Sequence, residues 1–256
     1  MNLRHPLSVF ILKSNLFISL CAIAMSLETS VILHTGWQSG WQYAFVFFAT
    51  LSSYNLYYIK SAAFSYHGML TIFGIVGSAV SLIMMPAIPY VYLVLIAILS
   101  VLYLLPVFVS FRKSSSYSFQ RLLILIWVWV LFTFQFQIPH HVIDLRYGLL
   151  LLYRILLLSH LCVLFFIRDE RNQTYKRMAA ISCIPLGVLQ LVVSILIMLQ
   201  GDLMLASIYI FITLLTIRVS RYVRVTSTST LYYLFFVDGI MLLQSAFVVL
   251  TLVCTS

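Results

Sequence analysis

Residues 147–177 read YGLLLLYRILLLSHLCVLFFIRDERNQTYKR, an apolar run that ends in a strongly basic segment. The apolar part, 147–167, is long enough to cross a lipid bilayer as one helix. The basic part is typical of a connection that stays on the cytoplasmic side of a membrane. This pairing predicts a transmembrane helix and also predicts which way it points.

The same pattern extends over the whole chain. The sequence is 63% hydrophobic and 8% charged, with a mean hydropathy of +1.08, which excludes a soluble domain of this size. Backbone polar groups in lipid must be paired within their own segment, so each span is expected to be a helix. We therefore predict an all-α polytopic membrane protein in which residues 1–256 form one domain. The nine predicted spans are 15–34, 41–59, 68–86, 88–110, 122–138, 147–167, 178–199, 202–218 and 231–253.

The basic residues are sorted to one side of these spans. Thirteen of the fifteen Lys and Arg residues fall in the N-terminal segment or in the connections after spans two, four, six and eight. Arg146 lies in an opposite loop and Arg154 lies within a span. The positive-inside rule then predicts a cytoplasmic N-terminus and an external C-terminus. The net charge of +9 fits anionic membrane lipids as partners and does not call for nucleic acid. The predicted location is the bacterial inner (plasma) membrane.

Three ionisable residues lie inside the predicted spans, where charge is expensive and usually faces the interior of a bundle. Glu28 and Arg154 are each about 10 Å from the outer face, at about 1.5 Å per helical residue. They are candidates for a structural ion pair, or else for two separate side chains that reach toward the surface. Asp238 points either toward a cavity open to the cytoplasm or to a hydrogen-bonded contact between helices.

Two polar clusters lie at the inner ends of spans two and six. The first, 54–60, reads YNLYYIK, and the second, 168–177, reads RDERNQTYKR. The tendency of Lys and Arg to lie on the cytoplasmic side of a membrane explains each basic residue by itself. It does not account for the amide of Asn55 or for the carboxylates of Asp169 and Glu170.

Nine spans with these two clusters resemble the UbiA-type intramembrane prenyltransferase superfamily. Asn55 matches the amide of the first family motif, and Arg168-Asp169 matches the start of the second. The resemblance covers the whole chain in topology but only these positions in motif. It implies a helical membrane enzyme that holds an isoprenyl diphosphate through Mg²⁺ bound by two aspartate-rich motifs.

The chain departs from the family pattern at the metal ligands. Ile59, Ala63 and Gln173 stand where aspartates are expected. Because a Mg²⁺ site draws on carboxylates, these changes predict that prenyl transfer is lost or, as an alternative, that it proceeds with altered metal dependence, and that Asp169 holds metal at most weakly. Basic side chains can still bind a phosphate group directly. We therefore predict that an isoprenoid diphosphate or a related lipid binds at a cytoplasmic-side site formed by Asn55, Lys60, Arg168, Asp169, Arg171, Lys176 and Asp238.

Two other functions compete with this prediction. One is a small-solute or ion transporter in which Glu28, Arg154 and Asp238 line the pathway. The absence of an internal repeat argues against many transporter folds. The other is a structural or assembly subunit of a membrane complex.

Weaker signals are interpreted as structural. His140, His141 and Asp144 could contact a metal ion, although such residues beside Pro139 are more often part of a polar loop. The cysteines have no CxxC spacing and predict neither a disulfide framework nor a zinc site. They are Cys21, Cys162, Cys183 and Cys254.

Overall fold

The fold was determined as a computed structural model, and it is all-helical in its described part, which contains no strand. It describes residues 11, 14–34, 39–58, 66–86, 90–108, 115–137, 144–169, 173–225 and 230–255. The helices are α2 (Leu16–Ile32), α3 (Gly40–Tyr58), α4 (Tyr66–Ile83), α5 (Tyr90–Phe108), α6 (Ser115–Thr133), the short 3-10 helix η1 (Gln135–Gln137), α7 (Leu145–Asp169), α8 (Gln173–Leu199), α9 (Leu203–Val225) and α10 (Thr230–Thr255).

Each predicted span overlaps one α-helix of the described chain, so the all-α class is confirmed. Among the described residues, five helical segments are long and apolar enough to cross a membrane. These segments are Tyr66–Ile83, Leu145–Ile167, Lys176–Leu199, Leu203–Tyr222 and Phe235–Cys254. Shorter apolar segments lie in α2, α5 and α6. The chain is therefore a helical protein with several segments suited to a membrane.

Several helix ends differ from the predicted spans. α8 begins at Gln173 and α9 continues to Val225, so Lys176, Arg177, Arg218 and Arg221 lie on helices instead of in loops. Hydropathy marks only the part of a helix that lies in hydrocarbon, whereas Lys and Arg are good helix formers and let the helix run beyond it. α6 stops at Thr133, because the chain tightens there into η1.

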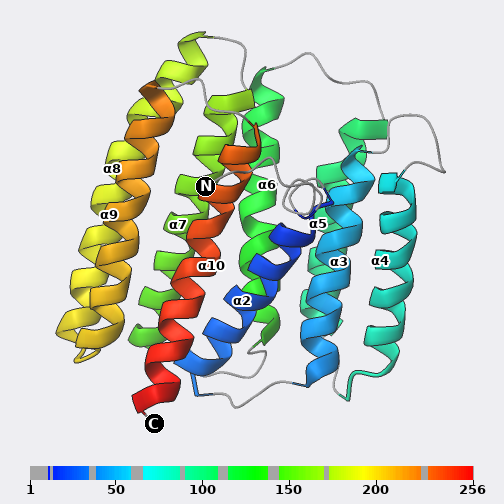
Figure 1. The fold of residues 1–256 in the computed structure, drawn as a ribbon, viewed down its shortest axis with the longest axis horizontal. Coiled ribbons are helices and arrows are strands. Elements are labelled where there is room, and N and C mark those ends of the chain that lie inside the picture. Colours follow the sequence, from blue (N-terminus) through cyan, green and yellow to red (C-terminus); the bar gives the residue numbers. More distant parts are fainter. Residues whose placement is uncertain are drawn as a thin grey trace.

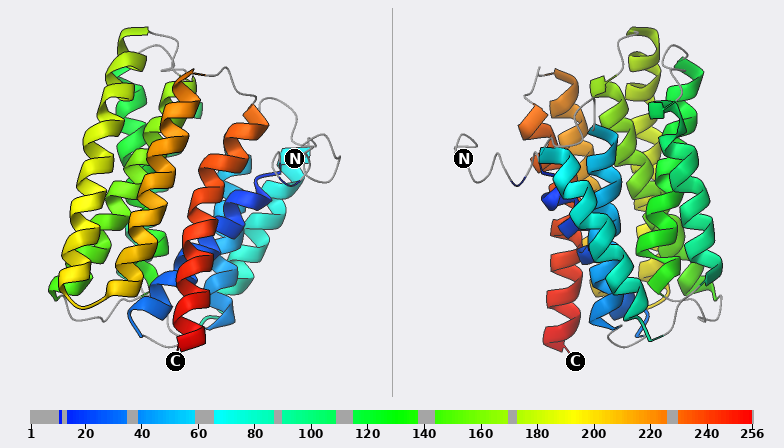
Figure 2. Two further views of the ribbon diagram at one scale, coloured as in Figure 1. Left: turned by 60° about the vertical axis from the view of Figure 1, so that its left-hand side comes forward. Right: turned by 90° about the vertical axis from the view of Figure 1, so that its right-hand side faces the viewer.

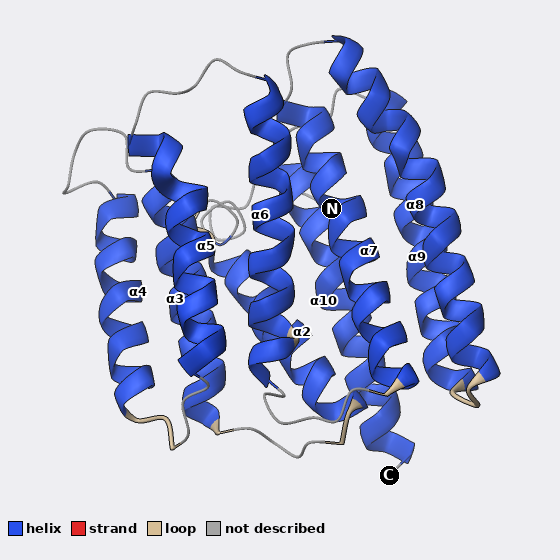
Figure 3. Cartoon of the chain, turned by 180° about the vertical axis from the view of Figure 1, so that it is seen from behind, coloured by secondary structure: helices blue, strands red, loops and turns tan. Residues whose placement is uncertain are grey.

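The helices run up and down in a flat bundle with a tilted helix at its centre (Figure 1). α8 and α9 form a hairpin at one edge, and α3 packs on α4 at the other. α7, α10 and α6 lie between these edges. The view from behind shows the same order with the two sides exchanged (Figure 3), and Figure 2 shows the bundle from two other sides. The central helix is α2, which packs on α3, α6 and α10.

The distribution of side chains differs from that in a soluble protein. Large apolar side chains face outward from the bundle, as at Met69, Ile83, Val91 and Ile184. Many of the buried residues are polar, including charged ones. Water would penalise this surface, whereas lipid chains would solvate it. The packing thus matches the membrane class that the composition predicts.

Candidate functional site

The centre of the bundle holds a buried ion pair between α2 and α7. Arg154 Nη2 lies 3.2 Å from Glu28 Oε2, and both side chains are almost completely excluded from the surface. Arg154 also reaches the Met25 carbonyl and the Thr29 hydroxyl, both at 3.4 Å. The two opposite charges predicted at similar depth therefore meet, and each compensates the other in a low-dielectric environment.

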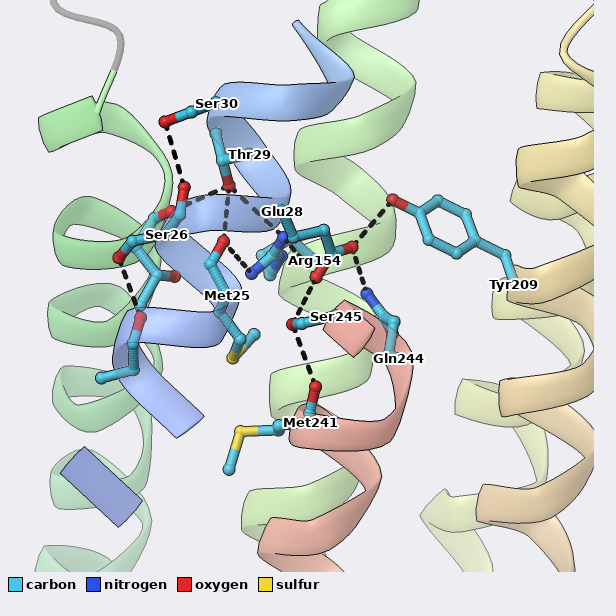
Figure 4. A network of polar contacts seen from close by, with 12 residues as sticks. Met25, Ser26, Glu28, Thr29, Ser30, Arg154, Tyr209, Met241, Gln244 and Ser245 are labelled. Atoms are coloured by element: carbon cyan, nitrogen blue, oxygen red, sulfur yellow. Dashed lines mark hydrogen bonds and ion pairs between the residues drawn. The ribbon is translucent and has the colours of Figure 1, made fainter. Parts of the chain in front are cut away.

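Three neutral side chains complete the shell of the Glu28 carboxylate (Figure 4). Gln244 donates to Oε1 at 2.7 Å, and Ser245 donates to Oε2 at 2.9 Å, both from α10. Tyr209 of α9 donates to Oε1 at 3.3 Å. With Arg154, donors from three helices fix the carboxylate of a fourth. Such a site is suited to holding helices together, because its lone pairs are already engaged.

Asn55 joins the start of α2 to α3 and α4. Its amide nitrogen donates to the carbonyls of Ser14 (3.0 Å) and Leu51 (2.9 Å). Its amide oxygen accepts from Asn15 Nδ2 at 3.3 Å and from His67 Nδ1 at 2.7 Å. Because this oxygen can only accept, the Nδ1 atom of His67 must carry a proton. All four hydrogen-bonding positions of the Asn55 amide are filled by the protein.

Asn15, the residue that precedes α2, is held in place by its hydrogen bond to Asn55. It adopts a left-handed backbone conformation (φ 61°), which asparagine tolerates better than most residues. Asn55 therefore holds the point at which the chain enters the central helix. Its predicted role in binding a diphosphate would require it to release one of these contacts.

Asp238 lies in the interior, eight residues after the first residue of α10. Its backbone carbonyl accepts a hydrogen bond from the Cys21 thiol at 3.3 Å. Its carboxylate acts electrostatically on Cys21, Tyr54 and Cys162. The Tyr54 hydroxyl in turn accepts a bond from Trp129 Nε1 at 3.0 Å. Side chains from α2, α3 and α7 thus lie within electrostatic range of this carboxylate of α10.

Of the remaining predicted site residues, Arg168, Asp169 and Lys176 lie at one end of the bundle. Arg168 and Asp169 form the last turn of α7, but their side chains lie outside the described part of the structure, as do Lys60 and Arg171 entirely. Lys176 lies on the first turn of α8 and is half-buried. The structure therefore brings Tyr54 toward Asp238 but does not bring Asn55 together with the described residues of the second cluster.

The described residues do not fit the Mg²⁺ site that the family resemblance implies. Every hydrogen-bonding position of the Asn55 amide is occupied, so it has none left to bind a metal ion or a metal-bound water. Among the described residues, no three His, Cys, Asp or Glu side chains are arranged to hold a metal ion. Asp144 is one of the loop residues considered for metal, and it caps α7 by accepting from the Tyr147 amide at 2.7 Å. His140 and His141 lie outside the described residues.

A further buried polar cluster, not predicted from the sequence, joins α7, α8 and α9. His160 Nε2 lies 2.8 Å from the Ser220 hydroxyl, and Nδ1 lies 3.4 Å from Gln190 Oε1. Ser220 donates to the Thr216 carbonyl at 2.7 Å. Neutral polar residues inside apolar spans were the signal that could have revealed it, because they need partners in lipid as charged residues do.

No family model matches this chain, and no curated protein or solved structure matches it either.

Proposed function

We propose that this chain is a UbiA prenyltransferase-like integral membrane protein that binds an isoprenoid diphosphate or a related anionic lipid without transferring its prenyl group. The binding site would lie at the end of the bundle where α7 ends and α8 begins. In this proposal that end faces the cytoplasm of a bacterial cell, and all nine helices cross the inner membrane.

The observation that carries the proposal is the concentration of positive charge at this end of an apolar bundle. Arg168 stands in the last turn of α7, and Lys176 stands in the first turn of α8. At the opposite end, Arg146 is neutralised by Asp202, with Nε and Oδ2 2.8 Å apart. The segment 168–176 has three basic and two acidic residues, and a net positive charge beside lipid favours a ligand with a phosphate headgroup and an apolar tail.

The contacts of Asn55 support the absence of prenyl transfer. In the resembled family this amide would belong to a metal and diphosphate site, but here it holds the start of α2 through Ser14 and Asn15. Without a metal the leaving diphosphate would lose the charge compensation that its departure requires. Binding through arginine and lysine needs no such metal.

The transporter alternative has less support. Glu28 and Arg154 would have to exchange contacts with a passing solute, but both are buried and held by neighbours from α2, α9 and α10. Releasing either partner would leave a charge in a low-dielectric interior, which typically costs about 3–5 kcal/mol.

The test is binding of farnesyl diphosphate to the full chain in nanodiscs, measured by calorimetry and by the shift in melting temperature. Farnesol and inorganic diphosphate, titrated separately, show whether tail, headgroup or both are recognised. We expect Arg168→Ala to weaken binding about tenfold or more, since one charged hydrogen bond contributes about 1.5–3 kcal/mol. EDTA should change binding only slightly.

The matched control is Arg146→Ala, which removes an arginine at the opposite end and should leave farnesyl diphosphate binding unchanged. Incubation with radiolabelled farnesyl diphosphate, Mg²⁺ and aromatic acceptors should give no prenylated product. Loss of binding on chelation, or steady turnover, would refute the metal-free proposal. Equal effects of the two arginine variants would refute the location of the site.

A further inference from the structure

The α8–α9 hairpin carries exposed arginines at one end of its outer face. Arg177 of α8 and Arg218 and Arg221 of α9 are exposed, and none forms an ion pair with a described carboxylate. Neither helix contains an Asp or Glu residue. The hairpin forms the edge of the bundle, so this face is turned away from the other helices (Figure 1).

The register of the hairpin shows that these arginines share one side. α8 and α9 touch at Gly187, where an added Cβ would lie 2.8 Å from Ile217 Cγ1. Each residue turns about 100° around a helix axis, because a turn has about 3.6 residues. Since the two helices are antiparallel, residues rotated in the same sense from this contact lie on the same side of the hairpin.

On one side, this rotation places the buried residues that face α7, among them Gln190 and Ser220. On the other side it places Arg177, Arg218 and Arg221 within one outward face. Apart from Ser207, the same face is apolar along the rest of the described length of α9. Its large exposed side chains are Ile181, Ile184 and Val188 on α8, and Phe211 and Leu214 on α9.

The charged and apolar parts also lie at matching heights. From the contact of Gly187 with Ile217, Arg221 is level with Cys183, and Arg218 is level with Leu186. The exposed Ile184 of α8 therefore lies beside the arginines of α9 at the same height. Long arginine side chains extend their guanidinium groups toward the aqueous end while their stems cover apolar surface.

We propose that this outer face of the α8–α9 hairpin is a binding site for an anionic glycerophospholipid. The phosphate contacts Arg218 and Arg221, and Arg177 contacts the outer part of the headgroup. The acyl chains lie along Ile184 and Val188 and along Phe211 and Leu214. The charge of the face selects an anionic over a zwitterionic headgroup, and its apolar stripe selects a lipid over a free phosphate. The site lies on the outside of the bundle, separate from the proposed diphosphate site.

The test uses the full chain and phosphatidylglycerol as the probe. Lipids bound to the protein are counted by native mass spectrometry during titration, with phosphatidylcholine as the zwitterionic comparison. A photoactivatable phosphatidylglycerol then locates the contact by peptide mapping. We expect the double variant Arg218→Gln/Arg221→Gln to lose about tenfold or more in affinity, at about 1 kcal/mol per basic residue. The cross-links should map to α8 and α9.

The matched control is Arg121→Gln, which removes one arginine from α6, a helix outside the hairpin. It should change phosphatidylglycerol affinity less than twofold, while Arg218→Lys/Arg221→Lys should retain most of the binding. Unchanged melting temperatures in phosphatidylcholine would verify that the variants fold. Equal losses in the α6 and α9 variants would mean diffuse attraction by all basic residues and would overturn the proposal. Equal binding of phosphatidylcholine, or cross-links away from the hairpin, would overturn it as well. Farnesyl diphosphate binding is a separate measurement, so either site can fail alone.

Discussion

Glu28 and Arg154 illustrate how a charge is tolerated in the interior of this protein. The carboxylate is compensated by one opposite charge, and neutral donors from α9 and α10 occupy its remaining positions. Breaking such a pair leaves one charge uncompensated, whereas replacing both partners with apolar residues can be nearly neutral. The contribution of this ion pair to stability therefore has to be measured by changing both residues together, and not either residue alone.

We expect Arg154→Met to lower the free energy of unfolding by about 3–5 kcal/mol, because the Glu28 carboxylate then stays buried without its cation. The double variant Glu28→Leu/Arg154→Met should be more stable than Arg154→Met. The recovery should be partial, since Gln244 then loses its acceptor, whereas Ser245 can still donate to the Met241 carbonyl. Thermal unfolding of the wild type, both single variants and the double variant measures the coupling. Strictly additive effects would show that the pair contributes no interaction energy.

Asn55 is a second residue whose role can be separated by substitution. An aspartate at this position cannot donate to the carbonyls of Ser14 and Leu51, so Asn55→Asp should remove both side-chain hydrogen bonds, although the Leu51 carbonyl keeps its helical backbone partner. We expect a loss of about 1–3 kcal/mol for the buried Ser14 carbonyl, seen as a lower melting temperature. His67→Gln, which can still donate to Asn55, is the milder control. If Asn55→Asp instead kept its stability and gained Mg²⁺-dependent diphosphate binding, the amide would be a lost metal ligand.

At the scale of elements, α3 and α4 show how closely two helices can approach. A Cβ on Gly74 would lie 2.8 Å from the Phe48 carbonyl and from the backbone nitrogen of Ser52. A Cβ on Gly77 would lie 2.5 Å from the Phe48 ring. Small residues at helix interfaces let the two backbones approach closely. This packing is important in lipid, where the hydrophobic effect does not drive helices to associate.

We predict that Gly74→Ala lowers stability by about 1–3 kcal/mol, because its methyl group meets backbone atoms that cannot move away. The matched control is Gly148→Ala in α7, where an added Cβ meets nothing within 4 Å. That change should raise stability by about 0.5–1 kcal/mol, since alanine is the better helix former. Melting temperatures in the same detergent compare the two variants. The changes in melting temperature of the two variants should have opposite signs. An unchanged melting temperature for Gly74→Ala would mean that α3 and α4 can separate at little cost.

At the scale of the molecule, the alternating helices and the sorted charges predict one orientation in the membrane. A reporter fused after Arg224 should be cytoplasmic, and a reporter fused at Ser256 should be external. α4 and α5 are separate helices that end and begin at Ile83 and Tyr90, which supports counting them as two spans. Fluorescence and phosphatase reporters at both positions measure the topology. A cytoplasmic C-terminus would mean that one of the shorter helices does not cross the membrane.

The all-α fold class and the helices of the described chain could be predicted from the sequence, because both depend on properties summed over long segments. Twenty apolar residues in a row specify a helix in lipid whatever its neighbours are, and the basic residues between spans report the side of the membrane. Helix ends were less accurate for the same reason. Hydropathy does not register that α9 continues to Val225 after its apolar part ends.

What the sequence alone determined is therefore an apolar, all-helical chain with three charged residues inside its apolar segments. The tertiary structure decided which polar groups meet. Gln244 and Ser245 reach Glu28 across more than two hundred residues of sequence, and Asn55 turns to Asn15 and His67. Such partners depend on how each helix is rotated and tilted against its neighbours. No pattern within one span encodes that rotation, because it is set by the packing of all the helices together.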